Sequence, residues 1–494
     1  MTGTQLLWTL IKILIMIGFA FNLAAVLTWA DRRQSAMIQD RIGPNRAVIK
    51  IFGKEIRLLG LLHPAADGIK FFTKEDFMPP KADKLLFSIA PMLAVFAVVA
   101  LIATIPFGDT LCLGPYMWHP AFKCAGGAVD LHVALVNGHH VCMDAASKII
   151  DSVAPQSSTV WPAVERSGVC MMDPGKGITP IDLVVAPLNI GILYVFAMAG
   201  QGIISAALAG FSSDNKFSLM GALRAASQMV SYEVTMGMSI IGAFMIYGTL
   251  RMDDMVRWQG EHTWGIFVQP FAFFLFFAAA VAESKRIPFD LPEAESELVS
   301  GYFTEYSGMK FGMFYLSEYV EVVTSSMLLV TLFLGGWELP FIHRDGLTIS
   351  FGDSVVVHQA MPHFWVSIIG ILAFFTKVAV TCFMQTFVRW SLPRFRYDQL
   401  MKLGWRILLP ASLANILVTG IVYLAIDKAG VGAANVLRMA ADITQAVILI
   451  GILYYVVRGI VGFVTPSKHA RWIVGSSATQ ADDAGGTKAS PMSA

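Results

Sequence analysis

Residues 271–310 read FAFFLFFAAAVAESKRIPFDLPEAESELVSGYFTEYSGMK, so an apolar run passes directly into an acidic segment. The apolar part, 271–281, carries no charged side chain and is typical of a helix that crosses a membrane. The acidic part holds six carboxylates, Glu283, Asp290, Glu293, Glu295, Glu297 and Glu305. A carboxylate close to hydrocarbon is costly, so this concentration of acid needs a reason.

The composition indicates that the whole chain belongs in a membrane. Of its 494 residues, 55% are hydrophobic and only 14% are charged, whereas a soluble domain carries about 25% charged residues. The mean hydropathy is +0.62. We therefore expect a polytopic membrane protein, and the net charge of +1 argues against a nucleic-acid-binding surface.

Nine segments contain the roughly 20 predominantly apolar residues that a membrane-spanning helix needs. They lie at about 6–30, 84–106, 181–208, 226–249, 264–282, 312–336, 363–388, 406–427 and 439–464. The expected fold class is an all-α polytopic membrane protein with about nine transmembrane helices. The first segment is interpreted as an uncleaved anchor, because Arg32 and Arg33 follow it and a small-residue cleavage pattern does not.

Positive charge predicts the orientation of the spans. The loop between the first two spans is rich in lysine and arginine, whereas the loop 107–179 has only Lys123, Lys148, Arg166 and Lys176. We therefore expect a periplasmic N-terminus and a cytoplasmic C-terminus. The expected parts are 1–106 (two helices and a cytoplasmic loop), 107–179 (a periplasmic insertion), 180–464 (helices three to nine with the acidic cytoplasmic loop 283–311) and 465–494 (a disordered tail).

Two polar segments on the outer side, 107–179 and 339–362, are interpreted as insertions. The first contains Cys112, Cys124, Cys142 and Cys170, for which we predict one or two disulfides in an oxidising periplasm. Its NGHHVCMD motif suggests a metal site, but the ligand set is incomplete and a structured loop is the simpler interpretation. The chain has no C-x-x-C pair and no histidine in the middle of a span. We therefore expect no iron–sulfur cluster, haem or metal in this chain.

Acidic residues also occur inside the predicted spans, at Glu233, Glu318 and Glu321. Each would cost about 2.5–3.5 kcal/mol if charged near the bilayer centre, so each must be paired, protonated or in a hydrated interior. A structural pair with a basic neighbour such as Arg224 or Lys377 is one interpretation. The other is a chain of carboxylates that leads from the cytoplasmic loop into the bundle, since burial moves carboxyl titration toward the neutral range that proton relay requires.

Local structure explains only part of the acidic loop. Asp290-Leu-Pro-Glu293 fits a helix start, with Asp as the N-cap and Glu closing a capping box. Glu293 and Glu297 share a helix face, and Glu295 does not. Capping leaves Glu283, Glu295, Glu297 and Glu305 unexplained.

The first loop contains the motif ADGIKFF (66–72), in which Asp67 and Lys70 lie beside Ile69 and two phenylalanines. An amphipathic helix at the membrane surface is the plain interpretation. A helix that walls the mouth of a lipid-accessible cavity is the alternative, and composition does not separate the two.

Five motifs carry a resemblance to a known family. They are QDRIGPNR, LLHPAADGIKFFTKE, ALRAASQMVSYEV, AESKRIPFDLPEAESELVSGYFTEYSGMKFGMFYLSEY and LPRFRYDQLMKLGWRILLP. Their order and spacing resemble the family of the NADH–quinone oxidoreductase H subunits of respiratory complex I, which includes mitochondrial NADH dehydrogenase subunit one. The resemblance covers about residues 6–427 without the two insertions.

This resemblance implies a membrane-arm subunit that forms the chamber through which a quinone enters from the lipid. It also implies partner subunits in the peripheral arm, which hold FMN and iron–sulfur clusters, and antiporter-like partners in the membrane arm. The family's acidic loop is implied to couple quinone reduction to proton translocation. Carried over by motif, the coupling residues are Glu283, Arg286, Asp290, Glu293, Glu295, Glu297 and Glu305, continued by Glu233 and Glu318. The residues near the quinone entrance or the peripheral arm are Arg33, Arg41, Arg46, Asp67 and Lys70.

The sequence departs from the family pattern at three places. His63 replaces the usual Gln, Asp31-Arg32 replaces Glu-Arg, and Glu321 has no expected counterpart. Two rivals remain open. One is the homologous subunit of a membrane-bound hydrogenase or of a complex fed by another donor. The other is a stand-alone secondary transporter, which should show an internal inverted repeat that we do not find.

Overall fold

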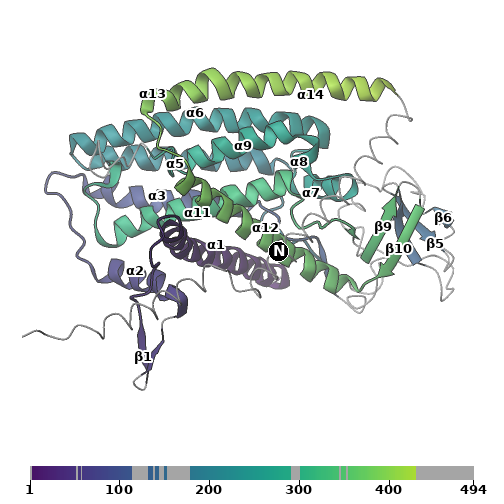
Figure 1. Ribbon diagram of the computed structural model, residues 1–494, viewed down its shortest axis with the longest axis horizontal. Helices are drawn as coiled ribbons and strands as arrows, with labels where there is room; N and C mark the ends of the chain where they lie inside the picture. The colour runs from purple at the N-terminus through teal and green to yellow at the C-terminus, as the bar shows by residue number, and fades with distance from the viewer. Residues whose placement is uncertain are drawn as a thin grey trace, which may run out of the picture. The chain divides into compact units, whose positions relative to one another are not determined.

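The structure of the chain is a computed structural model, and it describes residues 3–51, 54–56, 58–113, 132–136, 139–143, 149–152, 179–290, 301–343, 346–351 and 354–429. Helices dominate this part of the chain (Figure 1). The long helices are α1 (Gly3–Ile38), α3 (Lys84–Ile102), α5 (Gly191–Ser212), α6 (Lys216–Tyr247), α11 (Gly308–Phe333), α12 (His363–Ser391) and α14 (Leu409–Ala429). The shorter ones are α2 (Leu62–Thr73), α7 (Met252–Glu261), α8 (Gly265–Val268), α9 (Pro270–Glu283) and α13 (Tyr397–Lys402). The described residues also contain two short 3-10 helices, η1 (Leu58–Gly60) and η3 (Gly301–Phe303), and a π-helix, η4 (Leu403–Leu408).

Within the described residues, seven helices are long and apolar enough to cross a membrane, and α9 is a shorter apolar helix. The predicted all-α polytopic membrane fold is thereby confirmed. The predicted span 264–282 is divided into α8 and α9, because Gln269 has a non-helical backbone and Pro270 begins the second helix. The predicted ninth span, 439–464, and the tail, 465–494, lie outside the described residues.

The start of α6 differs from the prediction of 226–249. The helix begins at Lys216, where the side chain of Asn215 accepts a hydrogen bond from the amide of Phe217 and so caps the first turn. Residues 216–225 are therefore helical as well. As a consequence Glu233 lies roughly 25 Å along the helix from its start.

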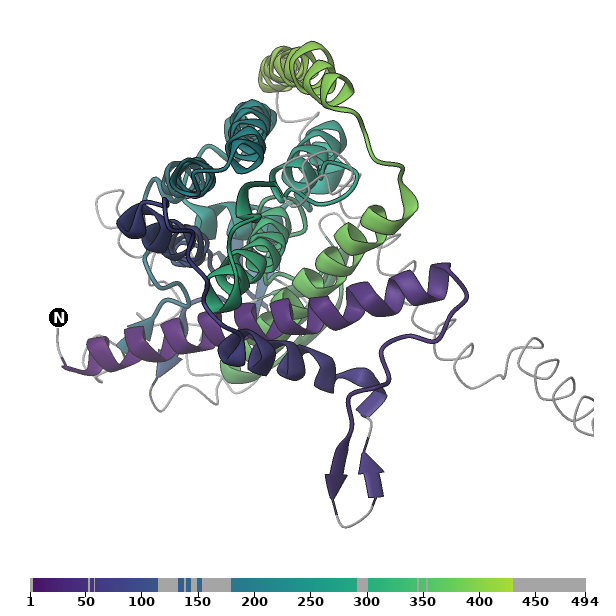
Figure 2. The same cartoon turned by 90° about the vertical axis from the view of Figure 1, so that its left-hand side faces the viewer.

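The bundle is built around α11, which packs against α1, α3, α9 and α12. In its most apolar window 89% of α11 is buried, against 22% for α1. α3, α5 and α6 pack as successive neighbours, and α14 lies along α6 (Figures 1 and 2). Ionisable side chains on α11 are therefore enclosed by other helices instead of facing lipid.

The bundle has two ends, which we name after the segments that are attached there. The loop end is where α1, α9 and α12 finish and the acidic loop begins. The insertion end is where α3, α6 and α11 finish and the two insertions begin. Strands occur at both: the hairpin β1 (Ile49–Ile51) and β2 (Lys54–Ile56) follows α1, and the others belong to the insertions.

The insertions form small antiparallel sheets. β3 (Leu111–Leu113) pairs with β7 (Thr179–Ile181), β4 (His132–Val136), β5 (His139–Met143) and β6 (Ile149–Ser152) form a second sheet, and β8 (Ile342–His343), β9 (Gly346–Phe351) and β10 (Ser354–Ala360) a third. β4 contacts both β9 and β10, so the two insertions meet. Cys124 and Cys170 lie outside the described residues, and the disulfides stay a prediction.

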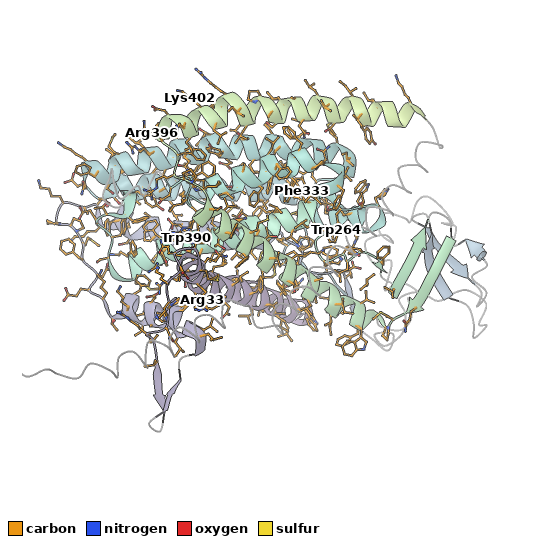
Figure 3. The ribbon with its side chains drawn as sticks, viewed as in Figure 1. Arg33, Trp264, Phe333, Trp390, Arg396 and Lys402 are labelled. Atoms are coloured by element: carbon orange, nitrogen blue, oxygen red, sulfur yellow. The ribbon has the colours of Figure 1, made fainter. Side chains whose placement is uncertain are left out.

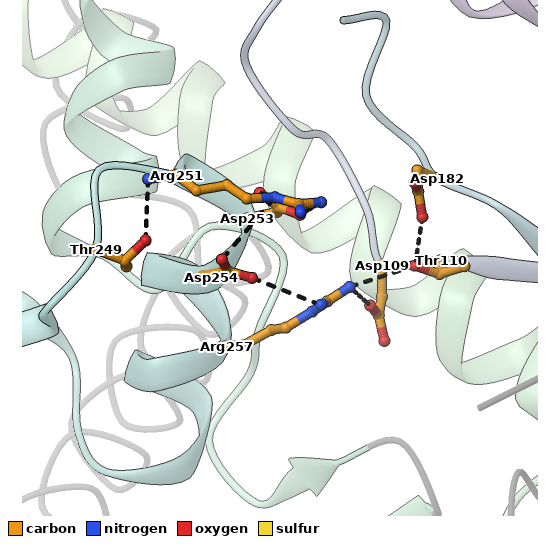
Figure 4. Close-up of polar contacts among 8 residues, drawn as sticks. All are labelled: Asp109, Thr110, Asp182, Thr249, Arg251, Asp253, Asp254 and Arg257. Atoms are coloured by element: carbon orange, nitrogen blue, oxygen red, sulfur yellow. Dashed lines mark hydrogen bonds and ion pairs between the residues drawn. The ribbon is translucent and has the colours of Figure 1, made fainter. Parts of the chain in front are cut away.

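A polar cluster ties α7 to the base of the larger insertion (Figure 4). Arg257 of α7 donates to Asp109 and to the hydroxyl of Thr110, both at 3.3 Å. Thr110 in turn donates to the carboxylate of Asp182 at 2.9 Å. From α1, Lys12 donates to the main-chain oxygen of Asp182 at 3.0 Å. The β3–β7 pair is thus fixed to two helices of the bundle.

Candidate functional site

The acidic loop is attached to the segment that follows α12. Arg394 forms an ion pair with Asp290 at 2.8 Å, and the amide of Phe395 donates to the carbonyl of Pro288 at 3.1 Å. Burial raises the pKa of the Asp290 carboxyl to about 6, although Arg394 acts to lower it. Asp290 therefore has a partner outside its own loop, which the capping interpretation did not include.

Glu318 is the centre of the polar contacts on α11. It faces Arg286, which follows α9, at 3.7 Å, and it accepts a hydrogen bond from the hydroxyl of Tyr302 at 3.2 Å. One turn further along α11, Glu321 pairs with Lys285 at 3.5 Å. The side chain of Glu318 is only 4% exposed, so this pairing is what makes a charge tolerable there.

These contacts show which basic residues pair with the intramembrane acids Glu318 and Glu321. The partners of Glu318 and Glu321 come from the residues directly after α9, and the suggested partners Arg224 and Lys377 have other contacts. Lys377 donates to three main-chain carbonyls, and Arg224 lies over the ring of Tyr397. The interpretation of a structural pair with a basic neighbour therefore fits Glu318 and Glu321, but the neighbours are Arg286 and Lys285 and not the examples Arg224 and Lys377. The sequence of one helix does not show which basic side chains of other segments reach it.

A second group of charges lies where α1, α11 and α12 meet. The Asp31 carboxylate accepts hydrogen bonds from the Tyr319 hydroxyl at 3.0 Å and the Trp390 indole at 2.6 Å, and it pairs with Arg389. The Tyr319 hydroxyl also contacts that of Tyr315 at 3.1 Å. This group, which we call the Asp31 cluster, was missed by the sequence reasoning.

The Asp31 cluster and the Glu318 pair adjoin one another. The guanidinium of Arg286 stacks on the ring of Tyr319, 3.9 Å from its centroid, so Tyr319 touches both groups. Between them is a cavity of about 10 Å³, whose lining includes Arg286, Tyr319, Gln385 and Arg389. That is about the space one water molecule needs. The loop end therefore contains one polar network that reaches from Asp31 to Glu318.

The remaining predicted acids lie around this network. Glu283, the last residue of α9, is near enough to Glu321 and Glu233 to interact electrostatically with both. Glu305 accepts a hydrogen bond at 2.6 Å from the side chain of Asn215, the residue that precedes α6. Glu293, Glu295 and Glu297 lie outside the described residues.

The predicted entrance residues lie at the end of α1 and on α2. Asp67 of α2 forms an ion pair with Arg32 at 2.5 Å, and Lys70 is exposed. Arg33 and Trp390 are both labelled at the loop end in Figure 3. The predicted amphipathic helix is formed as α2, and its residues Ile69 and Phe72 are 65% and 75% exposed. Arg41 donates to Ser35 at 3.3 Å, and Arg46 is exposed.

Comparison with known proteins decides the family. The chain matches the family model described as NADH dehydrogenase over residues 11–141 and 135–420. It is 37% identical over 410 residues to the NADH-quinone oxidoreductase H subunit numbered 1 of Cytophaga hutchinsonii, a match that covers 82% of this chain and 95% of that relative. The chain belongs to the family of NADH-quinone oxidoreductase H subunits. The H subunit of Thermomicrobium roseum, 37% identical over 432 residues, matches 84% of this chain and 98% of its own length.

Membership of the H-subunit family fixes the general role of the chain. It is a multi-pass membrane subunit of an enzyme complex, and its partners are the other subunits of complex I. In such a complex the FMN and the iron–sulfur clusters belong to other subunits. In the part of the chain that the structure describes, no group of three or more His, Cys, Asp or Glu side chains is arranged to hold a metal ion.

Proposed function

We propose that this chain forms the chamber through which a quinone reaches the redox centres of its partner subunits, and that its buried acids couple quinone reduction to proton movement. The observation that carries the proposal is the polar network at the loop end. It joins Asp31 on α1, Tyr319 and Glu318 on α11 and Arg286 after α9. Asp290 also interacts electrostatically with Glu318.

The quinone is expected to approach along α2 and the end of α1. The exposed side chains of Ile69 and Phe72 offer an apolar surface that a lipophilic quinone tail can follow from the bilayer. Charged groups beside this surface would orient the polar head. We assign that role, or contact with the peripheral arm, to Arg33, Arg41, Arg46, Asp67 and Lys70.

Coupling follows from charge balance in an interior of low dielectric. Reduction of a quinone consumes electrons from the partner clusters and protons from nearby groups. An ion pair worth about 1 kcal/mol at 4 Å in water is worth about 4 kcal/mol at an effective dielectric of 20. Loss or gain of a proton beside Asp31 therefore changes the strength of the ion pair between Arg286 and Glu318. This in turn changes the strength of the pair between Lys285 and Glu321. The acids Glu233 and Glu283 would pass the change toward the antiporter-like subunits.

The test is proton pumping by assembled complex that carries Asp290→Ala or Glu318→Gln. We expect quinone-coupled turnover to fall about tenfold or more in each, because the network loses a charge. Asp254→Asn, which changes an acid at the insertion end, is the matched control and should pump normally. If the first two variants pump normally, the loop serves only as a docking surface and takes no part in coupling.

We also propose that the membrane is a bacterial inner membrane, with the loop end in the cytoplasm. The supporting observation is the concentration of lysine and arginine between α1 and α3. The single-cysteine variant Lys70→Cys should react with a membrane-impermeant thiol reagent in inverted vesicles only. Reaction in intact spheroplasts would show that the orientation is the opposite of the one proposed.

A further inference from the structure

The end of α11 is capped by side chains from other helices. The last carbonyl oxygens of a helix have no partner within it and are usually satisfied by water or a turn. Here Gln259 of α7 donates to the carbonyl of Thr331 at 2.9 Å, and Tyr247 of α6 to that of Leu332 at 2.8 Å. Gln259 also accepts from the amide of Gly335 at 3.0 Å. Protein groups thus bind the carbonyls that water or a turn usually satisfies at a helix end.

Lys377, midway along α12, completes the cap. Its Nζ donates to the carbonyls of Leu334 (2.8 Å), Gly336 (3.0 Å) and Glu338 (2.5 Å). An ammonium group has three donors and no acceptor, so three carbonyl acceptors match its protonated form. The ring centre of Trp264, 4.5 Å away, adds a cation–π contact. Figure 3 labels Trp264 toward the insertion end, away from the polar network.

An uncharged layer separates this cation from the acids. Between Glu321 and the end of α11 the chain reads VVTSSMLLVTLF, and α9 reads PFAFFLFFAAAVA before Glu283. The segment 378–388 of α12 also has no acidic or basic side chain. At 1.5 Å per residue the α11 stretch is about 18 Å long. Glu283, Glu318 and Glu321 thus lie on one side of a packed, uncharged layer. Lys377 lies on the other side, where the Glu338 carboxylate is near enough to interact with it electrostatically.

We propose that Lys377 is an electrostatic seal, which prevents protons held by the acids of the loop end from leaving through the insertion end. A fixed positive group repels hydronium in a narrow passage, as arginine and the positive ends of half-helices do in water channels. It also balances the partial negative charge at the C-terminus of α11, which would otherwise attract a proton. Protons are then left with the lateral route to neighbouring subunits. The inference rests on the proposed function, because it requires acids that carry protons.

The experiment measures the passive proton leak of intact complex in liposomes, with an internal pH dye and an imposed potassium diffusion potential. Lys377→Met and Lys377→Gln remove the charge, and Gln keeps an N–H donor for the carbonyls. Lys377→Arg keeps the charge. We expect a leak on the order of tenfold faster in both neutral variants, a wild-type leak in the arginine variant, and uncoupled NADH:quinone turnover within about twofold of wild type in all three.

Two further variants separate a seal from a packing defect. Tyr247→Phe removes a donor of the cap without changing its charge, and should not leak. Adding Glu318→Gln to Lys377→Met should return the leak toward the wild-type value, because the leaking proton passes through that acid. A leak that persists in the double variant, or is absent from both neutral variants, overturns the seal.

The outcomes also distinguish the seal from the proposed function. If both neutral variants fail to assemble while the arginine variant assembles, Lys377 is needed for folding and the seal is overturned. A different result would show that the proposed function is wrong: complex with Glu318→Gln alone would then pump normally, whatever the leak of the Lys377 variants.

Discussion

At the scale of single residues, a carboxylate as buried as Asp31 is tolerable only when its charge is balanced and its oxygens accept hydrogen bonds. Its two oxygens receive donors from Tyr319 and Trp390 and pair with Arg389, and its side chain is 7% exposed. Removal of one member of a buried ion pair leaves the other uncompensated, which costs more than the pair itself contributes. The cluster should therefore be sensitive to truncation of Asp31.

Asp31→Ala is expected to destabilise the assembled subunit by about 3–5 kcal/mol, because the partly buried Arg389 loses its carboxylate. The measurement is the midpoint of thermal inactivation of the complex in membranes. Asp67→Ala is the matched control: it removes the more exposed pair with Arg32, and should cost only about 0–1 kcal/mol. Equal shifts for the two variants would contradict the assignment.

A second residue-scale prediction concerns Asp290, whose pKa burial raises to about 6 from its ordinary value of 3.8. The raised pKa means that the folded protein binds this proton more tightly than the unfolded chain. The stability that it contributes is therefore present at low pH and lost as the pH rises through about 6. Asp290→Asn, which stays neutral, should remove that step from a plot of inactivation midpoint against pH. A step of the same size and midpoint in the variant would assign it to another group.

At the scale of elements, close helix contacts govern whether the network can form. A Cβ atom at Gly221 of α6 would lie 2.7 Å from the amide nitrogen of Tyr302 and 2.8 Å from the backbone of Gly301. α6 can thus approach η3 only because residue 221 has no side chain. Tyr302 in turn donates to Glu318, so this contact positions a member of the network.

Gly221→Ala is expected to cost about 1–3 kcal/mol through overpacking and to lower quinone-coupled turnover by moving Tyr302 away from Glu318. Gly237→Ala in the same helix is the control, because a Cβ there meets nothing within 4 Å. It should be neutral or slightly stabilising, since alanine favours a helix more than glycine does. Turnover and inactivation midpoint measured on both variants test the pair, and an unaffected Gly221→Ala would show that η3 adjusts freely.

The helices also show which features of the fold and of the site can be predicted from the sequence alone. Length and hydropathy suffice for the spans, because burial in lipid requires both, but boundaries depend on local caps such as Asn215 before α6. Glu318 could be identified as costly in a membrane, and the family motifs included Arg286. The Asp31–Arg389 pair joins positions 358 residues apart, and no local pattern connects them. Asp31 was noted only as a departure from the family pattern, in the pair Asp31-Arg32.

At the scale of the whole molecule, the two ends of the bundle have different chemistry. The loop end combines acids, bases and tyrosines of several helices in one network. At the insertion end the charged residues around Arg257 hold the base of the larger insertion, and Lys377 and Gln259 bind backbone groups of a helix terminus. Under the proposed function, protons are exchanged at the loop end, and under the proposed seal the insertion end is closed to them. The insertions are attached to the closed end, so they should be separable from turnover.

The last prediction tests that separation by replacing residues 114–178 with an Asn-Gly turn. Leu113 and Thr179 are opposite one another at the end of the β3–β7 pair, and a two-residue turn is the usual connection of such a hairpin. The base of the hairpin is held independently, by Arg257 through Asp109 and Thr110 and by Lys12. We expect the shortened chain to assemble and to keep quinone-coupled turnover within about twofold of the full chain, whereas Arg257→Ala in the shortened chain should lower the inactivation midpoint, since its ion pair is partly buried. Loss of turnover in the assembled, shortened complex would instead make the insertion part of the working subunit.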